Sequence, residues 1–257
     1  HRTPSPDPAT TTNWDNGALP TASENVTIIT GAANMPQVTQ DPASPAVCNN
    51  LTINTGQSLT VNAGKALTVN GTITNNGTLS VKSDATGTGS LITSATPSAT
   101  VERYMSKDNY HYISSPVASQ AISTEFINTS GGGTLPSEID FYTWDETQLN
   151  SWINIKQADF TLNPAFETNF GVCKGYVYAN SSSAVTKNFT GTLNSGDKTV
   201  TLTKSPLGQR GWNMVGNPFA SSVAVNVSAD ATNNLLTLNT ASLNDSREAI
   251  YLWNQTT

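Results

Sequence analysis

Short phrases of alternating apolar and polar residues recur in the first third of the chain. The clearest are Leu-Thr-Ile-Asn-Thr-Gly from Leu51, Leu-Thr-Val-Asn-Ala-Gly from Leu59 and Leu-Thr-Val-Asn-Gly from Leu67. Because side chains alternate along a strand, the Leu and the Ile or Val of each phrase share one face and Thr takes the other. Each phrase therefore predicts a half-buried strand, and Gly56 and Gly64 predict the turns that follow two of them.

Such a phrase is long enough for one side of a coil, so three phrases, roughly 20 to 24 residues, would complete one turn of a repeat structure. Apolar residues recur at this spacing in three series, namely Ile29, Leu51 and Ile73; Leu59 and Leu79; and Leu67 and Leu91. Stacked, they predict apolar columns inside a short parallel β-helix, which is right-handed because parallel β connections have that hand. We predict this solenoid over residues 12–99, after a linker of residues 1–11.

The predicted solenoid has a cap and one interruption. Trp14 and Leu19 are expected to cover the first coil, since solenoid ends expose their core; an exposed binding role is the alternative for Trp14. Residues 35–48 contain three prolines. They predict a loop that bulges from the first full coil.

Residues 100–257 form the second predicted domain and contain a longer internal repeat. His111-Tyr-Ile-Ser-Ser-Pro-Val-Ala-Ser matches Asn213-Met-Val-Gly-Asn-Pro-Phe-Ala-Ser, and Asp140-Phe-Tyr-Thr-Trp matches Ala249-Ile-Tyr-Leu-Trp. The two matches occur in the same order and at nearly the same offset. They predict a degenerate duplication within an all-β, sandwich-like domain.

Alternation and turn signals predict individual elements of this domain. Residues 142–155 predict a hairpin, and residues 175–179, 185–193 and 199–203 predict further strands. Only residues 229–239 favour a short helix.

Composition narrows the classes of function. The chain has 257 residues, of which 12% are charged, and its net charge is −6 with only 12 Lys and Arg. So few basic residues cannot neutralise the phosphates of a nucleic acid, and we expect no nucleic-acid partner. No apolar run approaches the roughly 20 residues of a membrane span. The abundance of Thr, Ser, Asn and Gly is typical of a secreted β-protein.

The two cysteines, Cys48 and Cys173, fall in different predicted domains. In an oxidising compartment they could form an interdomain disulfide. The apolar strand context of each cysteine favours buried, unpaired thiols instead.

Four motifs together resemble those of a group of secreted proteins. The motifs are Trp14-Asp-Asn-Gly-Ala-Leu-Pro, Cys48-Asn-Asn-Leu-Thr-Ile-Asn, His111-Tyr-Ile-Ser-Ser-Pro and Gly211-Trp-Asn-Met-Val-Gly-Asn-Pro-Phe. The combination resembles the large cell-surface proteins of Bacteroidetes that are exported by the type IX secretion system. The resemblance implies an extracellular or outer cell-surface location, and it implies no particular activity.

The C-terminal end of the chain departs from that group. No C-terminal sorting domain is recognisable, and the second copy of the repeat stops shortly after Trp253. We expect the native protein to continue beyond Thr257. Residues 249–253 would then form an edge strand that the following segment or a neighbouring domain completes.

The sequence contains no convergent set of catalytic residues. Charged residues of the solenoid are scattered, and about four coils are short for a polysaccharide-cleaving β-helix. His111 lies near Ser114 and Ser115, but His111 and Ser114 are predicted to face opposite sides of a strand, and a nucleophile elbow is absent. Cys173 and His111 could act as a nucleophilic thiol and its general base only if the fold brought their side chains into contact.

The signal for a metal or cofactor is limited to three carboxylates. Asp140, Asp145 and Glu146 are a weak indication of calcium, and no cysteine and histidine cluster has the spacing of a metal site. We expect no other cofactor.

Aromatic residues are the remaining candidates for binding. Tyr142 and Trp144 share one strand face, as do Tyr251 and Trp253. We expect these pairs to be ridges of the core, because the domain contains few other large apolar residues; a platform for sugar rings is the alternative. On that alternative the glycan-binding candidates are Tyr142, Trp144, Trp152 and Trp253.

The sequence therefore favours a non-catalytic extracellular surface module for adhesion, spacing or weak glycan binding, with a polysaccharide or cell-surface glycan as its partner. The alternative is a polysaccharide-active enzyme, a lyase or hydrolase, with a groove between the two domains.

Overall fold

The computed structural model describes residues 14–15, 17–31, 34–122, 125–127, 134–206, 211–243 and 249–251. The chain forms two compact units, residues 1–220 and residues 221–257. The second unit contains the described helices, α1 (Leu235–Leu238) and η2 (Thr240–Ser242), and α1 begins after Asn234, whose side chain accepts a hydrogen bond from Thr237 N. The short helix predicted within residues 229–239 is confirmed. All described strands belong to the first unit.

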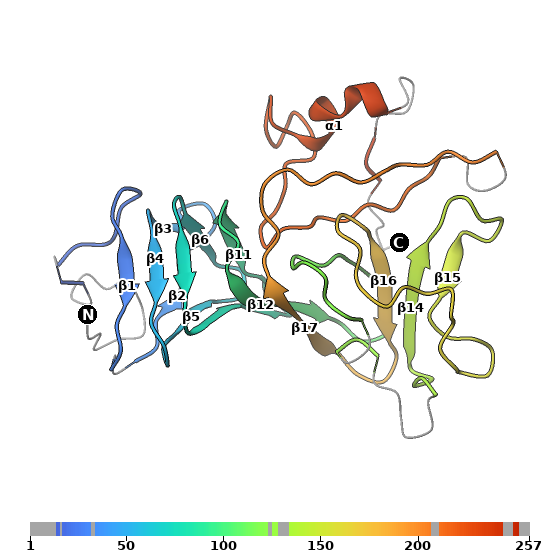
Figure 1. Cartoon of the computed structure of the whole chain (residues 1–257), viewed down its shortest axis with the longest axis horizontal. Helices are drawn as coiled ribbons and strands as arrows, with labels where there is room; N and C mark the ends of the chain where they lie inside the picture. The colour runs from blue at the N-terminus through green and yellow to red at the C-terminus, as the bar shows by residue number, and fades with distance from the viewer. Residues whose placement is uncertain are drawn as a thin grey trace. The chain divides into compact units, whose positions relative to one another are not determined.

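The N-terminal part of the first unit is a β-solenoid of about three turns with three walls (Figure 1). The walls consist of β1 (Val26–Ile28), β4 (Leu51–Ile53) and β7 (Ile73–Asn75); of β3 (Ala46–Cys48), β6 (Ala66–Val69) and β11 (Ser90–Thr93); and of β2 (Gln37–Val38), β5 (Ser58–Val61), β8 (Thr78–Val81) and β12 (Ser98–Met105). Neighbouring strands of each wall pair in parallel. The predicted parallel β-helix is confirmed. A small antiparallel pair, β9 (Ser83–Asp84) with β10 (Gly87–Thr88), projects after β8.

Apolar side chains stack inside the solenoid largely as predicted. Two columns are confirmed by direct strand pairing, namely Leu59 with Leu79 and Leu67 with Leu91. In the third column Leu51 lies between Ile73 and Val26, and Ile29 is 37% exposed. The prediction for Ile29 is wrong because β1 lies three residues earlier in register, so that Val26 takes the inward position.

The proline-containing segment of residues 35–48 belongs to the coil and is not a bulging loop. It supplies β2 and β3, which place Val38 beside Val61 and Cys48 beside Val69. The loop prediction is wrong because all three prolines lie outside these two short strands, where no ladder donor is required.

The predicted turns between the strands are present, but the predicted N-terminal cap is present only in part. Gly56 and Gly64 adopt the predicted turns, with φ of 76° and 69°. Trp14 is half-buried, but Leu19 is exposed, so the cap prediction is wrong for Leu19. The chain before β1 bends at residues 17–18 and turns at residues 22–23, and the Leu19 side chain between them stays exposed.

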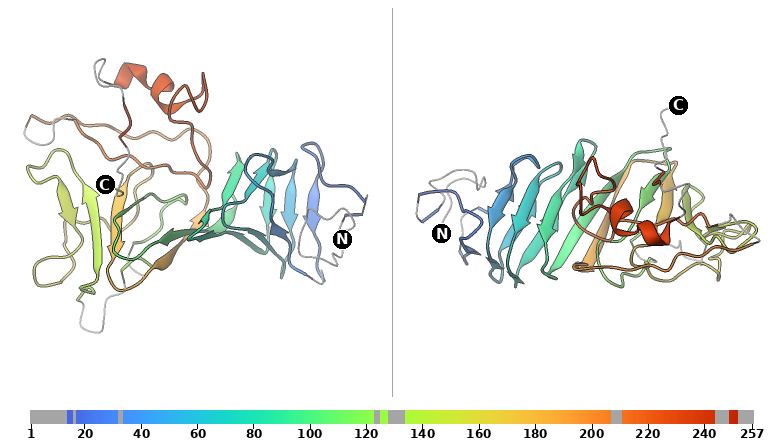
Figure 2. Two further views of the ribbon diagram at one scale, coloured as in Figure 1. Left: turned by 180° about the vertical axis from the view of Figure 1, so that it is seen from behind. Right: turned by 90° about the horizontal axis from the view of Figure 1, so that it is seen from above.

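Strand β12 joins the solenoid to the second region. It pairs in parallel with β8 and in antiparallel, over its full length, with β17 (Val185–Thr192). A single five-stranded sheet therefore continues across the predicted boundary near residue 99, which falls inside β12 (Figure 2). The solenoid and the second region share this sheet and belong to one compact unit.

The second region is a four-stranded antiparallel sheet that packs against β17. Its strands, in spatial order, are β13 (His111–Ile113), β16 (Tyr176–Asn180), β14 (Ile139–Trp144) and β15 (Trp152–Asn154). The hairpin predicted over residues 142–155 is confirmed by β14 and β15, and the strands predicted at 175–179 and 185–193 are confirmed by β16 and β17.

An aromatic core fills the space between this sheet and β17. Phe126 lies at its centre, with ring centroids 6.0 Å from Phe141 of β14 and 4.9 Å from Phe189 of β17. Phe170 adds contacts to Phe189 and to Tyr176 of β16. Two layers of sheet thus enclose one core, as predicted for a sandwich-like domain.

The proposed duplication is visible in one of its two motifs. Ser115 Oγ accepts a hydrogen bond from Val117 N, and the matching Asn217 Oδ1 accepts one from Phe219 N, so both copies make the same turn around a proline. The copies also touch, because a Cβ on Gly216 would lie 2.4 Å from Ser114 Cβ. This motif is a repeated proline turn rather than a repeated strand.

Other predictions for the C-terminal part were wrong or fall outside the description. Residues 199–203 form no strand, because Val200 and Leu202 are both exposed and no strand covers either of them. Residues 249–251 lie outside any strand, unlike the matching residues of β14. Trp253 lies outside the described residues, and with it the rest of the predicted edge strand.

Candidate functional site

The outer face of the four-stranded sheet carries the exposed aromatic residues of this region. Along β14, Ile139, Phe141 and Thr143 are buried, whereas the alternate side chains are only partly buried. Because side chains alternate along a strand, Tyr142 and Trp144 point away from the aromatic core. The prediction that this pair forms a core ridge is therefore wrong. Tyr176 and Tyr178 of β16 fill the core instead.

Four rings form a continuous series on this outer face, and we call them the aromatic row. The row runs in the order Tyr110, Tyr142, Trp152 and Trp144. Successive ring centroids are 6.4, 6.1 and 4.8 Å apart, with interplanar angles of 60°, 79° and 79°. Tyr110 and Trp152 are each 46% exposed. The row is therefore an ordered and accessible set of edge-to-face ring contacts.

Small apolar side chains of β16 lie between the aromatic residues. Val177 pairs with Tyr112 of β13 on one side and with Tyr142 on the other, and Ala179 pairs with Asp140. Val177 and Ala179 are buried, whereas Tyr112 is exposed. The large aromatic side chains of β13 and β14 therefore lie on either side of a central strand, β16, whose side chains on this face are small.

Polar groups gather at the Tyr110 end of the row. Asp140 Oδ2 accepts a hydrogen bond from the Tyr110 hydroxyl at 3.4 Å, and Asp140 Oδ1 lies 3.4 Å from Lys156 Nζ. Burial, and then the charge of Asp140, raises the pKa of Tyr110. Burial also raises the pKa of Tyr142, and the Asn154 side chain, which hydrogen-bonds its hydroxyl, opposes that shift. Both phenols remain neutral donors at neutral pH.

The Trp144 end of the row is held by a following loop. Trp144 Nε1 donates a hydrogen bond to the Trp212 carbonyl at 2.6 Å. That loop is fixed by Glu146, whose Oε2 accepts hydrogen bonds from Ser205 N at 3.0 Å and Gly211 N at 3.2 Å. The hydrogen bonds from Ser205 and Gly211 lower the pKa of Glu146. Trp144 is therefore preoriented by residues distant in sequence.

Three of the four predicted glycan-binding candidates come together in this row, namely Tyr142, Trp144 and Trp152. The fourth, Trp253, lies outside the described residues. Sequence reasoning missed Tyr110 and Tyr112, although they alternate on either side of His111. The partners of Tyr110 on β14, Asp140 and Tyr142, lie about 30 residues away, and Tyr112 pairs with Val177 of β16, so both positions became visible only with the sheet order β13–β16–β14.

In the part of the chain that the structure describes, no hydrogen bond joins His111 to Ser114, Ser115 or Cys173, the residues considered for catalysis. His111 Nε2 contacts Ser106 Oγ at 3.1 Å, and Ser114 Oγ is buried with no hydrogen-bond partner among the described residues. Cys48 and Cys173 are both buried free thiols, so the disulfide alternative is not realised. Burial raises the pKa of Cys48 to about 11, which keeps it protonated at neutral pH.

The three carboxylates considered for calcium have separate roles. Asp140 faces Lys156, Asp145 accepts hydrogen bonds from Thr147, and Glu146 holds the loop described above. Across the described ranges, no group of three or more His, Cys, Asp and Glu side chains could hold a metal ion.

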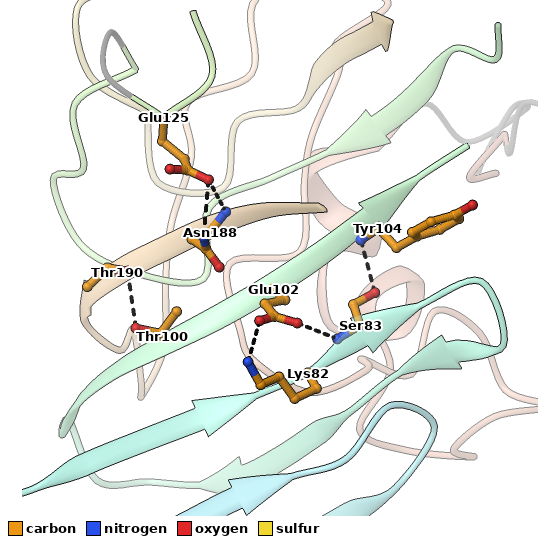
Figure 3. A network of polar contacts seen from close by, with 8 residues as sticks. All are labelled: Lys82, Ser83, Thr100, Glu102, Tyr104, Glu125, Asn188 and Thr190. Carbon is orange, nitrogen blue, oxygen red and sulfur yellow. Dashed lines mark hydrogen bonds and ion pairs between the residues drawn. The ribbon is translucent and has the colours of Figure 1, made fainter. Parts of the chain in front are cut away.

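A second polar cluster lies at the junction between the solenoid and the second region (Figure 3). Glu102 of β12 contacts Lys82 Nζ at 2.6 Å and accepts a hydrogen bond from Ser83 N at 3.3 Å. On the opposite edge of β17, Glu125 accepts a hydrogen bond from Asn188 N at 2.8 Å. The Glu102 contacts tie β12 to the chain that follows β8, and the Glu125 contact ties residue 125 to β17, so we assign both a structural role.

The fold and the outer face define a class of protein, an all-β solenoid joined through one sheet to an antiparallel layer that exposes aromatic side chains. The chain belongs to a family described as a domain of unknown function, DUF8693, whose family profile matches residues 4–257. No curated protein and no solved structure matched the chain. Neither described helix has the length and apolar character needed to cross a membrane.

Proposed function

We propose that this protein is a non-catalytic, extracellular glycan-binding module in which the aromatic row contacts the sugar. The observation that carries the proposal is a row of four ordered rings, two exposed and two partly buried, on a sheet whose opposite face already has a complete aromatic core. Exposed clusters of large apolar side chains are costly in water and mark binding surfaces. Side chains that were needed only for stability would be expected on the buried face.

The orientation of the rings supports a particular kind of glycan. Adjacent rings of the row are close to perpendicular, with angles of 60° to 79°, so the row is not a flat platform. A flat crystalline surface would contact few of these rings face-on. A single flexible glycan chain, whose successive sugars turn relative to one another, can stack on one ring and meet the edge of the next.

The β-solenoid suits a role as a spacer for this surface. Its walls are paired in register from β1 to β12, and the shared sheet continues into β17. Repeat structures of this kind are stiff because each coil is held by its neighbours. Together with the motifs that resemble exported Bacteroidetes proteins, this supports an adhesive or spacing role at the cell surface.

A glycan array combined with a turnover assay tests the proposal. We expect the purified chain to bind one or more polysaccharides without releasing reducing ends or unsaturated products. Trp152→Ala should clearly weaken binding while circular dichroism remains unchanged. Ile92→Ala is a matched control, because Ile92 is 45% exposed on a solenoid strand far from the row in sequence.

Two results would argue against the module. Turnover of a bound polysaccharide would favour the enzyme alternative. Equal loss of binding in Trp152→Ala and Ile92→Ala would show that the row is not the contact surface.

A further inference from the structure

We infer that the aromatic row takes a neutral glycan rather than an acidic one, and that Asp140 is the residue that determines this specificity. The inference rests on the proposed function, since it concerns the same surface.

Asp140 offers acceptor capacity to a ligand. Its side chain is 38% exposed, and among the described residues each carboxylate oxygen has one hydrogen-bond or ion-pair partner, at 3.4 Å. A carboxylate oxygen accepts two hydrogen bonds, so both oxygens of Asp140 have room for a donor. Asp140 therefore presents an exposed carboxylate that is open to hydroxyl groups, whereas the side chain of its ion-pair partner Lys156 is largely buried.

The nearest cation is already committed. The Lys156 side chain is only 9% exposed, and its ammonium contacts Asp140 and donates a hydrogen bond to Ser137 O at 3.1 Å. The ammonium also lies 5.6 Å from the centre of the Phe160 ring. Lys107, in the turn before Tyr110, lies 3.7 Å from Asp108. Both lysines are thus balanced by an aspartate.

These contacts decide between two ligand classes. A neutral sugar presents pairs of hydroxyl groups that can donate to Asp140, and Asn154 on the same face can both donate and accept. A uronate or a sulfated sugar presents an acceptor-only anion to an exposed carboxylate, with no uncommitted cation at that end of the described surface. Like charges at a binding surface suppress the wrong partner.

Isothermal titration calorimetry with hexasaccharides of matched length tests the inference. The probes are cellohexaose, laminarihexaose and mannohexaose as neutral ligands, and hexagalacturonate and hexamannuronate as acidic ligands. We expect the best neutral ligand to bind the native chain at least about tenfold more tightly than either uronate, the size of effect of one hydrogen bond to a charged group.

Substitutions separate specificity from binding. Asp140→Asn keeps the shape and removes the charge, so it should weaken the best neutral ligand by about tenfold and reduce the preference over uronates. If loss of the partner of Lys156 unfolds that variant, Asp140→Asn combined with Lys156→Met takes its place. Trp152→Ala should weaken all ligands without changing their ratio.

The outcomes distinguish the two proposals. Tighter binding of a uronate, lost in Trp152→Ala, would overturn the neutral specificity and leave the glycan-binding function intact. An unchanged ligand ratio in Asp140→Asn would overturn the role of Asp140. Failure of every hexasaccharide to bind, or binding that is unaffected by Trp152→Ala, would overturn the proposed function itself.

Discussion

The solenoid and the four-stranded sheet share the same period-two alternation of side chains, but they differ in the residues that this alternation places on each face. In the solenoid the inward residues are mostly aliphatic and the outward strand residues are mostly Thr and Ser, while Asn50, just before β4, hydrogen-bonds to Asn25 and Thr72 of the neighbouring coils. In the four-stranded sheet, aromatic rings occupy both faces of β14. One face is explained by the core, and the other is not. The contrast shows that repetition specifies the fold, whereas the departure from it marks the face for which we propose a binding role.

Adjacent residues of β14 give the strongest test of this contrast. Phe141 is fully buried among several rings, so Phe141→Ala should lower the free energy of unfolding by about 3–5 kcal/mol. Tyr142 is partly exposed, and Tyr142→Ala should cost about 1 kcal/mol. Urea unfolding of both variants measures the difference. Equal losses would mean that the outer rings belong to a core after all.

Two glycines sharpen the description of the coils. A Cβ on Gly77 would lie 2.2 Å from Gln57 O, so Gly77→Ala should destabilise the chain by about 1–3 kcal/mol through overpacking. Gly56 has φ of 76° and open space around it, so Gly56→Ala should cost about 1 kcal/mol through backbone strain alone. Thermal unfolding compares them. A larger loss in Gly56→Ala would contradict the close stacking of the coils at Gly77.

Acidification should affect the loop that supports Trp144. The folded-state pKa of Glu146 is lowered, so its contribution to stability is present above the unfolded value of about 4.3 and is lost as pH falls through the folded pKa. At pH values below about 4 we expect the midpoint of urea unfolding to decrease. We expect this decrease to be smaller in the Glu146→Gln variant. An identical pH profile for both proteins would remove Glu146 from this account.

The cysteines should give the smallest effect. Both thiols are buried and free, and burial raises the pKa of each, so neither presents much thiolate. We expect a thiol reagent at neutral pH to react slowly with the folded protein and to titrate two thiols after unfolding. Fast reaction of the folded protein would contradict this burial, and an absence of thiols after unfolding would establish a disulfide.

Sequence reasoning succeeded where neighbouring residues carried the information. The three phrases from Leu51, Leu59 and Leu67 specified the walls and most of the columns, because each coil repeats the same local pattern. It failed where the decisive contact was distant. Nothing near Tyr142 indicated that β16 would pair beside β14 and supply Tyr176 and Tyr178 to the core, nor that Tyr110, just before β13, would contact the Tyr142 ring. The position of Val26 in place of Ile29 likewise depended on a three-residue shift in register that alternation does not fix.

The location of a bound glycan tests the central claim most directly. We would determine the crystal structure of the chain grown with whichever neutral hexasaccharide binds most tightly in calorimetry. The account predicts sugar rings against Tyr142 and Trp152, with hydroxyl groups at Asp140. A glycan bound to the solenoid walls, with the aromatic row open to solvent, would contradict it.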